Sequence, residues 1–481
     1  MYSRFVRTAM CFGPSLGLFG CGADNPAAPV TPTITGLNAQ LNPYNNLSSV
    51  ITFIADHADS ARVIYWSSGQ SPDTTPFRPV SSGTDTVFTL GMKASTNYYY
   101  QVELVGPKGT TESDTLLLAS GSLPEPLQEA RLAITGTAGP GYTLTALYGG
   151  TSAFLVAFDR SGEIRWYRGF DEGVGPVEAK QQPSGNFTLF LGRSFGFNPT
   201  YGRFVEFLPN GVTVQNHFAG QPYYTNPHEL LLTPNEGAGE NAHLFGYDIR
   251  NLDLSSFGGP ASALVAGHAL LRHSANGEPD FIWSAWDHFS LDDCVNPPPA
   301  FIGNLDFDHP NSLAFDRDGN YIASFYRFNA VVKIDARSGD ILWQLGGVKN
   351  QFTILNDPLG GFGAQHDARI LDNGNLLLYD NGHYHSPPES RAAEYALDPV
   401  NMTATLVWEY RHTPGIFTPI LGSAQRLLNG NTFVGFTQAG KVAEVAPNGA
   451  VVWEGDIQVA GVAYAAYRAI RIASLYKYQR P

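Results

Sequence analysis

The sequence of 481 residues predicts an all-β protein built from many short strands. Two observations lead to this prediction. The chain contains 51 glycines and 33 prolines, which favour frequent turns. Between those turns stand short apolar runs, and the periodicity of amphipathic helices is almost absent. With 43% hydrophobic and only 15% charged residues, the chain is expected to be globular and large enough for two domains.

The N-terminal segment is expected to direct export. Two arginines precede an apolar stretch, residues 9–20, that is too short to span a bilayer and has the form of a signal peptide. It ends on Leu-Phe-Gly-Cys, which resembles a bacterial lipobox with Cys21 as the lipidated residue; a plain secretory signal is the alternative. We therefore predict a signal peptide at 1–21 and a flexible linker at 22–32. The protein would be periplasmic or an outer-membrane lipoprotein, touching the membrane only through this anchor.

Residues 33–122 are expected to form a small β-sandwich. Short runs with alternating apolar residues are typical of strands that bury one face. The run STNYYYQVELVG resembles the late strands of fibronectin type III domains. The predicted strands cover residues 50–54, 61–66, 86–90, 98–105 and 115–119.

Residues 127–475 contain a repeat. A polar turn, with glycine in five of its six copies and followed by a strand that usually carries tryptophan, begins at 157, 207, 273, 333, 394 and 444. A second class of turn, such as RILDNGNLLLYD at 369, lies between these copies, so that each repeat holds two hairpins and four antiparallel strands. Units of this length and strand number predict a six-bladed β-propeller, closed by a strand from 462–475.

Four polar residues stand where the first strands of three repeats begin, and an arginine follows in one of these repeats. His228, Asn311 and His366 precede the glycine of a turn by eight or nine residues, so they are expected at equivalent positions near one mouth of the propeller channel. His309 lies two residues before Asn311, on the same side of an extended chain. Arg327 follows one strand later. These five residues are therefore expected to line one shared cavity.

These side chains favour transfer of an anionic group. Arginine and asparagine donate hydrogen bonds to an oxyanion, and a neutral histidine can attack it. Three histidines also suit zinc, but an arginine beside a divalent cation is unfavourable, so we expect no metal. The chain has no Gly-x-x-x-x-Gly-Lys phosphate loop, and we expect no cofactor. Its net charge of −14 argues against nucleic acid as a partner.

The motifs DHPNSLAFDRDGNYIASFYRFNAVVKID and QHDARILDNGNLLLYDNG resemble the bacterial arylsulfate sulfotransferases across nearly the whole mature chain. That family consists of six-bladed propellers with an N-terminal β-sandwich. The Gln-His context of its sulfated histidine matches His366, and its His-x-Asn with a later arginine matches His309, Asn311 and Arg327. Its earlier histidine matches His228. One departure is the family disulfide, which Cys294 alone cannot form.

The resemblance implies a ping-pong transfer from an aryl sulfate donor to a phenolic acceptor without the nucleotide PAPS. His366 would carry the sulfuryl group as a sulfohistidine. Arg327, Asn311 and His228 would hold the sulfuryl oxygens, while His309 would move protons. Since the family includes dimers, a homodimer is one expected assembly.

The alternative is a non-catalytic periplasmic propeller that serves as a binding or assembly scaffold. The remaining histidines are expected to be structural or exposed, apart from two that could form a lid or second shell around the site. Those two are His383 and His385, and the others are His217, His243, His268, His273, His288 and His412. Aromatic residues that could stack on a phenol are Tyr223, Tyr224, Phe325, Tyr326 and Phe417.

Overall fold

The computed structural model confirms the all-β prediction. It describes residues 30–81, 83–149, 151–172, 178–192, 202–234, 239–275, 277–295 and 305–476. Within these ranges the chain forms 37 strands and five 3₁₀ helices, namely η1 (Glu125–Leu127), η2 (Ser255–Phe257), η3 (Ala285–Asp287), η4 (Leu291–Asp293) and η5 (Thr437–Ala439). No helix in the described ranges is long and apolar enough to cross a membrane. The predicted signal peptide with Cys21 and most of the linker lie outside the described residues.

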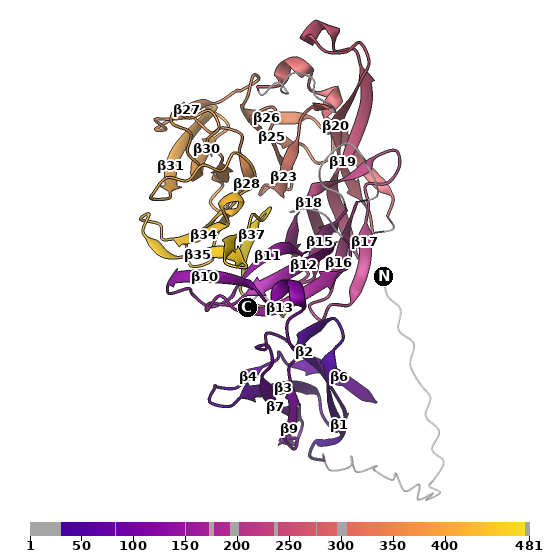
Figure 1. Cartoon of the computed structure of the whole chain (residues 1–481). Helices are drawn as coiled ribbons and strands as arrows, with labels where there is room; N and C mark the ends of the chain where they lie inside the picture. The colour runs from indigo at the N-terminus through magenta and orange to yellow at the C-terminus, as the bar shows by residue number, and fades with distance from the viewer. Residues whose placement is uncertain are drawn as a thin grey trace, which may run out of the picture.

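Two sheets come from the N-terminal part of the chain and lie together at one end of the molecule (Figure 1). The first consists of β1 (Thr33–Asn42), β2 (Asn45–Asp56) and β6 (Thr84–Thr89). The second consists of β3 (Ser60–Ser67), β4 (Asp73–Thr74), β5 (Arg78–Pro79), β7 (Asn97–Gly106), β8 (Gly109–Glu112) and β9 (Leu116–Ala119). Alternating burial along β3 and β7 places one face of that sheet in a shared core, as the sequence pattern predicted.

Six further sheets follow among the described residues, and we number them in chain order. Sheet 1 contains β11 (Tyr142–Gly149), β12 (Ser152–Phe158), β13 (Ile164–Phe170) and β37 (Ala469–Ile472). Sheet 2 contains β14 (Ala179–Gln181), β15 (Phe187–Leu191), β16 (Arg203–Phe207) and β17 (Thr213–His217). Sheet 3 contains β18 (Tyr224–Pro234), β19 (Glu240–Leu252), β20 (Ala263–His273), β21 (Pro279–Ser284) and β22 (Leu305–Asp306).

The other three sheets contain four to six strands each. Sheet 4 contains β23 (Pro310–Phe315), β24 (Tyr321–Phe325), β25 (Ala330–Ile334) and β26 (Ile341–Gly346). Sheet 5 contains β27 (Thr353–Leu355), β28 (His366–Ile370), β29 (Leu376–Asp380), β30 (Arg391–Asp398) and β31 (Thr403–Arg411). Sheet 6 contains β10 (Ala130–Gly136), β32 (Ser423–Arg426), β33 (Thr432–Phe436), β34 (Lys441–Val445), β35 (Val451–Val459) and β36 (Val462–Ala463).

Strands from the two ends of this region join early and late sheets. β37, near the C-terminus, pairs with β11 and becomes the edge strand of sheet 1; it lies inside the segment predicted to supply a closing strand. β10 in turn pairs with β35 in sheet 6. One edge strand of each of sheets 3, 4, 5 and 6 contacts that of the next sheet, β18 with β23, β23 with β28 and β28 with β32. Polar side chains at the heads of these strands are thereby drawn together.

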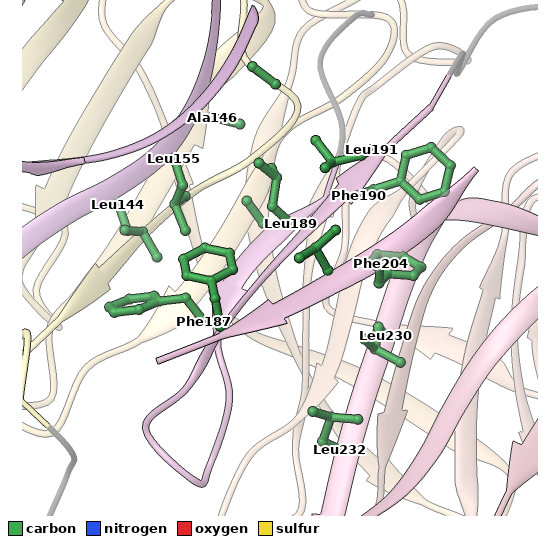
Figure 2. Close-up of a cluster of buried hydrophobic side chains, with 14 of the residues drawn as sticks. Leu144, Ala146, Leu155, Phe187, Leu189, Phe190, Leu191, Phe204, Leu230 and Leu232 are labelled. Atoms are coloured by element: carbon green, nitrogen blue, oxygen red, sulfur yellow. The ribbon is translucent and has the colours of Figure 1, made fainter. Parts of the chain in front are cut away.

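A buried hydrophobic cluster holds sheets 1, 2 and 3 against each other (Figure 2). Leu155 of sheet 1, Phe187 and Phe204 of sheet 2 and Leu230 of sheet 3 are fully buried within it. Trp166 stacks on Phe187 with ring centroids 4.6 Å apart. Burying one large apolar side chain stabilises a fold by about 1.5 to 3 kcal/mol, so this cluster fixes sheets 1, 2 and 3 relative to one another.

The turns follow the predicted chemistry. Gly319, in the turn between β23 and β24, and Gly374, in the turn between β28 and β29, have φ angles of 81° and 88°. Residues with a side chain rarely adopt these angles, which explains the glycine after Asp or Asn. Each turn closes with a hydrogen bond, such as that from the Gly374 amide to the carbonyl of Leu371 at 2.8 Å.

Candidate active site

The predicted residues occupy irregular points at the inner edges of sheets 3, 4 and 5. His228 lies in β18, Asn311 in β23, and His366 begins β28. The strand pairing shifts register at each of these places. Such a bulge redirects a side chain away from the regular alternation. His309, just before β23, has a φ of 49°, which breaks the extended geometry expected there.

The structure brings the three histidines together. The rings of His228 and His309 lie 4.7 Å apart between centroids. Tyr326 bridges the other two, with its ring 5.4 Å from His309 and 5.9 Å from His366. Tyr467 lies 5.7 Å from the ring of His228. One aromatic surface therefore runs through all three histidines.

His228 uses Nδ1 for a bond that determines its tautomer. Oδ1 of Asn226 lies 3.0 Å from the backbone nitrogen of His228 and 2.8 Å from its Nδ1. A backbone N–H can only donate, so the atom facing it is the amide oxygen, which also requires a proton on Nδ1. In the neutral ring, Nε2 then carries the lone pair.

His366 is bound in the same manner by Asn381. Nδ1 of His366 lies 2.8 Å from Oδ1 of Asn381 and 3.3 Å from the carbonyl oxygen of Ala364. Both partners accept, so Nδ1 donates. Within the described part of the chain, Nε2 of His366 has no hydrogen-bond partner.

His309 differs because its partner is charged. Its Nδ1 bonds to a carboxylate oxygen of Asp306 in β22. Burial alone would raise the pKa of Asp306, but His309, followed by His268 and Arg327, holds that pKa below its usual value. A carboxylate partner stabilises the charged form of a histidine strongly, whereas the uncharged amide oxygens that face His228 and His366 stabilise it less.

Burial keeps the other two histidines neutral. It lowers the pKa of His366 to about 3, and the nearby His309 adds to this effect. Burial also holds the pKa of His228 well below its usual value, again with a contribution from His309. At neutral pH both rings therefore have an available lone pair on Nε2.

Arg327 lies in the turn after β24, where its amide donates to the carbonyl oxygen of Asp308 at 3.2 Å. Its Nε is buried without a hydrogen-bond partner, and no ion pair joins its guanidinium to a described carboxylate. Arg426 and Arg468 also have a buried Nε without a hydrogen bond, but both guanidinium groups form ion pairs. Among the described residues, Arg327 is thus a cation beside the histidines without an ion pair of its own.

Asn311 is fully buried and forms a hydrogen bond with the backbone next to His366. Its Nδ2 donates to the carbonyl oxygen of Gln365 at 2.7 Å, and its Oδ1 has no partner among the described residues. This bond fixes the residue that immediately precedes His366.

A buried ionic network lies next to the histidines in sequence and in space. Glu229 pairs with Lys180, with Arg369 at 2.7 Å and with Arg468 at 3.3 Å. Asp367 pairs with the same two arginines, at 2.7 Å and 3.5 Å. The network links sheets 2, 3 and 5 to the segment before β37. Among the described residues, neither Glu229 nor Asp367 forms an ion pair with a histidine.

One group near the site has the composition of a metal site. Ligand atoms of His268, Asp306 and Asp308 lie within 4.8 Å of one another. Nδ1 of His268 already bonds Asp308, as His309 bonds Asp306. A cation there would also lie close to the charge of Arg327, which acts on Asp306. The donor set therefore fits two carboxylate–histidine pairs better than a bound cation.

Several site residues were missed in the sequence. Asp306 was not identified because the alternation of side chains along a strand predicts no acidic residue beside the histidines. His268 was expected to be structural or exposed; it is buried, and its Nε2 has no hydrogen-bond partner among the described residues. Asn226 could have been found, since an asparagine often bonds the backbone two residues on. Counting outward from the turn at Gly374 places Tyr379 opposite His366 and so brings Asn381 near it. Tyr467 gave no local signal.

Other expectations can be compared directly. His217 pairs with Glu206 and His412 with Glu454, both as structural contacts. His385 bonds Asp380 close behind His366. Phe325 belongs to the buried core. Burial raises the pKa of Cys294 to about 12, which disfavours the thiolate form.

Comparison with known proteins confirms the resemblance. Residues 221–459 match the family model for arylsulfotransferase (ASST). The arylsulfate sulfotransferase AssT of Escherichia coli O6:H1 (strain CFT073) is 24% identical over 353 residues, an alignment that covers 59% of this chain and 57% of that protein. The match thus spans little more than half the length of this relative.

Solved structures show more distant likenesses. A protein of unknown function from Bacteroides caccae aligns with 70% of this chain and 100% of its own, at 16% identity and a TM-score of 0.42. A catalytically inactive virginiamycin B lyase from Staphylococcus aureus, solved with quinupristin, covers 70% of this chain and 92% of its own, at 10% identity and a TM-score of 0.36.

Proposed function

Because residues 221–459 of this chain match the arylsulfotransferase family, we propose that the protein transfers a sulfuryl group from an aryl sulfate to a phenol. The transfer needs no nucleotide donor and proceeds in two steps through a sulfohistidine at His366. The catalytic residues are His366, His228, His309, Asn311 and Arg327.

One observation carries this proposal. Three histidines lie together, each with Nδ1 bonded to an oxygen and Nε2 unused, beside an arginine that has no ion pair within the described residues. A free nucleophilic nitrogen, a carboxylate-paired histidine and an uncompensated guanidinium are the groups that transfer of an anionic group requires.

In the first step the lone pair on Nε2 of His366 attacks the sulfur. The nitrogen–sulfur bond forms while the bond between sulfur and the aryl oxygen breaks. The departing phenolate takes a proton from charged His309, whose partner Asp306 supports that charge. Arg327 donates to the sulfuryl oxygens, which spread negative charge as in phosphoryl transfer.

The second step reverses the first with a new phenol. His309, now neutral, takes the proton of the acceptor hydroxyl, whose oxygen attacks the sulfur and displaces His366. Neutral His228 has no donor on Nε2, since Asn226 binds its Nδ1–H. We therefore assign His228 as a hydrogen-bond acceptor for the phenol or for charged His309, in place of the sulfuryl-binding role that the resemblance implied.

Mass spectrometry tests the function. The protein is incubated with 4-nitrophenyl sulfate or 4-methylumbelliferyl sulfate, digested and searched for a peptide containing His366 that has gained one SO₃ group. The adduct is expected in the unmodified protein and absent in His366→Asn. Released phenol without an adduct on His366 would contradict the sulfohistidine, and no release from a varied set of donors would favour the scaffold alternative.

The architecture and location remain part of the same proposal. We interpret residues 127–475 as a six-bladed propeller whose blades are sheets 1 to 6, and residues 33–122 as a β-sandwich. The N-terminal lipid anchor, the periplasmic or outer-membrane location and the homodimer stay predictions. Limited proteolysis between the two regions and labelling with radioactive palmitate test the domain division and the anchor.

A further inference from the structure

Asn381 is the hydrogen-bond partner of the proposed nucleophile, and its side chain can adopt only one amide orientation. It is fully buried directly after β29. Its Nδ2 donates to the carbonyl oxygens of Thr418 at 2.7 Å and Leu421 at 2.9 Å. Reversing the amide would place its oxygen against two carbonyl oxygens, where no proton is available. Oδ1 must therefore face His366.

We infer that Asn381 is a positioning residue that keeps the proton of neutral His366 on Nδ1, so that the reactive lone pair is always on Nε2. The contact of 2.8 Å between Oδ1 of Asn381 and Nδ1 of His366 carries this inference. It deepens the proposed function and rests on it for its chemical consequence.

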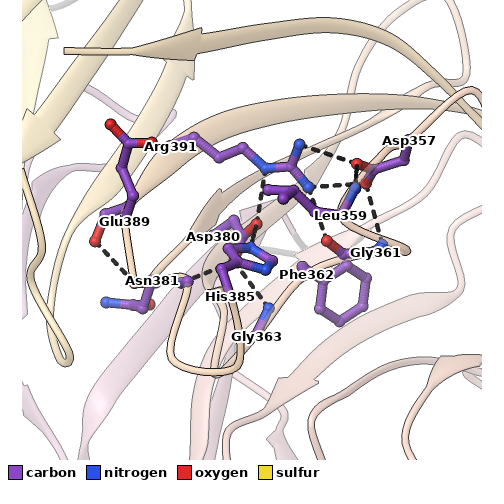
Figure 3. A network of polar contacts seen from close by, with 12 residues as sticks. Asp357, Leu359, Gly361, Phe362, Gly363, Asp380, Asn381, His385, Glu389 and Arg391 are labelled. Carbon is purple, nitrogen blue, oxygen red and sulfur yellow. Dashed lines mark hydrogen bonds and ion pairs between the residues drawn. The ribbon is translucent and has the colours of Figure 1, made fainter. Parts of the chain in front are cut away.

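A polar network around Asp380 and Arg391 surrounds Asn381 and includes Gly361 and Gly363 (Figure 3). The hydroxyl of Ser390 donates to the carbonyl oxygen of Asn381 at 2.8 Å. The neighbouring Asp380 accepts from the amide of Gly363, three residues before His366, at 2.8 Å. Buried Arg391 donates to the same carboxylate at 2.8 Å and to the carbonyl oxygen of Gly361 at 2.7 Å. Movement of Asn381 relative to His366 would break these hydrogen bonds.

The fixed tautomer affects both chemical steps. When Nε2 bonds to sulfur, the proton stays on Nδ1 and the ring becomes positively charged. When the acceptor oxygen displaces the ring, the nitrogen–sulfur bond breaks and its electron pair returns to Nε2. The leaving group is then neutral imidazole with its Nδ1 proton in place. Without that proton an imidazolide anion would have to leave, which is far less favourable.

Nitrogen NMR of the full protein tests the tautomer without any substrate. The protein is labelled with ¹⁵N-histidine, and the signals of His366 are identified by their loss in His366→Asn. A protonated Nδ1 and an unprotonated Nε2 are expected at pH 7. In Asn381→Ala both nitrogens should give averaged shifts from mixed tautomers. A proton on Nε2 of His366 in the unmodified protein would overturn the inference.

Kinetics provides the second readout. Asn381→Ala should lower kcat by about 10- to 100-fold with little change in KM, as is typical for groups that orient a histidine. In Asn381→Asp, a carboxylate faces the ring and raises the pKa of His366, so the rate of adduct formation should fall with decreasing pH several pH units earlier than in the unmodified protein. An unchanged pH profile in Asn381→Asp would contradict the inference.

Asn42→Asp is the matched control. Asn42 is buried and also donates through Nδ2 to two oxygens, those of Ser48 at 3.2 Å and Asn210 at 2.8 Å, but it lies in the first N-terminal sheet. Its replacement should lower stability without moving the pH profile. The protein could show a proton on Nδ1 of His366 and yet form no adduct. That result would overturn the sulfotransferase proposal but would still support the inferred tautomer.

Discussion

The rings of His228 and His309 lie 4.7 Å apart at an angle of 66°, although His228 lies in sheet 3 and His309 just before the first strand of sheet 4. Their Nδ1 atoms have different partners, a carboxamide for His228 and a carboxylate for His309. This difference divides the pair chemically: His309 is the ring that can hold a positive charge, and His228 is the ring that accepts a hydrogen bond beside it.

The first prediction concerns proton transfer by His309. His309→Gln should reduce kcat/KM by about 10²- to 10⁴-fold for donors whose phenol is a poor leaving group, because the departing phenolate then receives no proton. The loss should be small for 4-nitrophenyl sulfate, whose phenolate leaves unaided. A series of substituted phenyl sulfates measures this as a steeper dependence on leaving-group pKa. The control His217→Gln, in sheet 2, should keep the original slope, and a uniform loss across the series would argue against proton transfer.

The second prediction concerns Arg327. Arg327→Lys keeps the charge but loses the planar set of donors, so inorganic sulfate should inhibit adduct formation about 10- to 100-fold more weakly, as expected for one or two charge-assisted hydrogen bonds. Arg337, which is exposed, provides the control substitution Arg337→Lys, and it should leave the inhibition constant unchanged. Equal inhibition of Arg327→Lys and the unmodified protein would remove Arg327 from the anion site.

The third prediction is the pH dependence of adduct formation. Because burial lowers the pKa of His366 to about 3, the neutral nucleophile persists until the pH falls through that value. The burst of 4-nitrophenol should therefore be constant from about pH 8 to 5 and decline only at lower pH, whereas an ordinary histidine would lose reactivity near pH 6.5. A decline centred near pH 6.5 in a rapid-quench experiment would contradict a buried, neutral His366.

The fourth prediction concerns the ionic network beside the site. Glu229→Gln removes the buried carboxylate that Lys180, Arg369 and Arg468 share, and should destabilise the fold by about 3 to 5 kcal/mol, although Glu178 and Asp367 remain as partners. Glu103→Gln removes the partner of Arg62, a partly exposed pair, and should have an effect of about 0 to 1 kcal/mol. Denaturant unfolding compares the two variants. Similar losses would mean that the network adds little to stability.

Much of the fold was predictable because its signals are local. Alternating apolar residues predicted strands such as β3 and β7, and the glycine after Asp or Asn predicted turns with positive φ. Equivalent positions in the repeat predicted that His228, Asn311 and His366 lie at the inner edges of their sheets. Register shifts at these three residues were not predictable, since a bulge depends on pairing with another strand.

The sequence by itself determined the all-β class, the repeated hairpins and the three histidines that meet at the candidate site, because periodicity and turn chemistry act over a few residues. Only the tertiary structure decided which ring nitrogen of each histidine is free. Asp306 reaches His309 from β22, and Asn381 reaches His366 from beyond the end of β29. A tautomer depends on the partner that faces Nδ1 in space, and spacing along the chain carries no record of that contact.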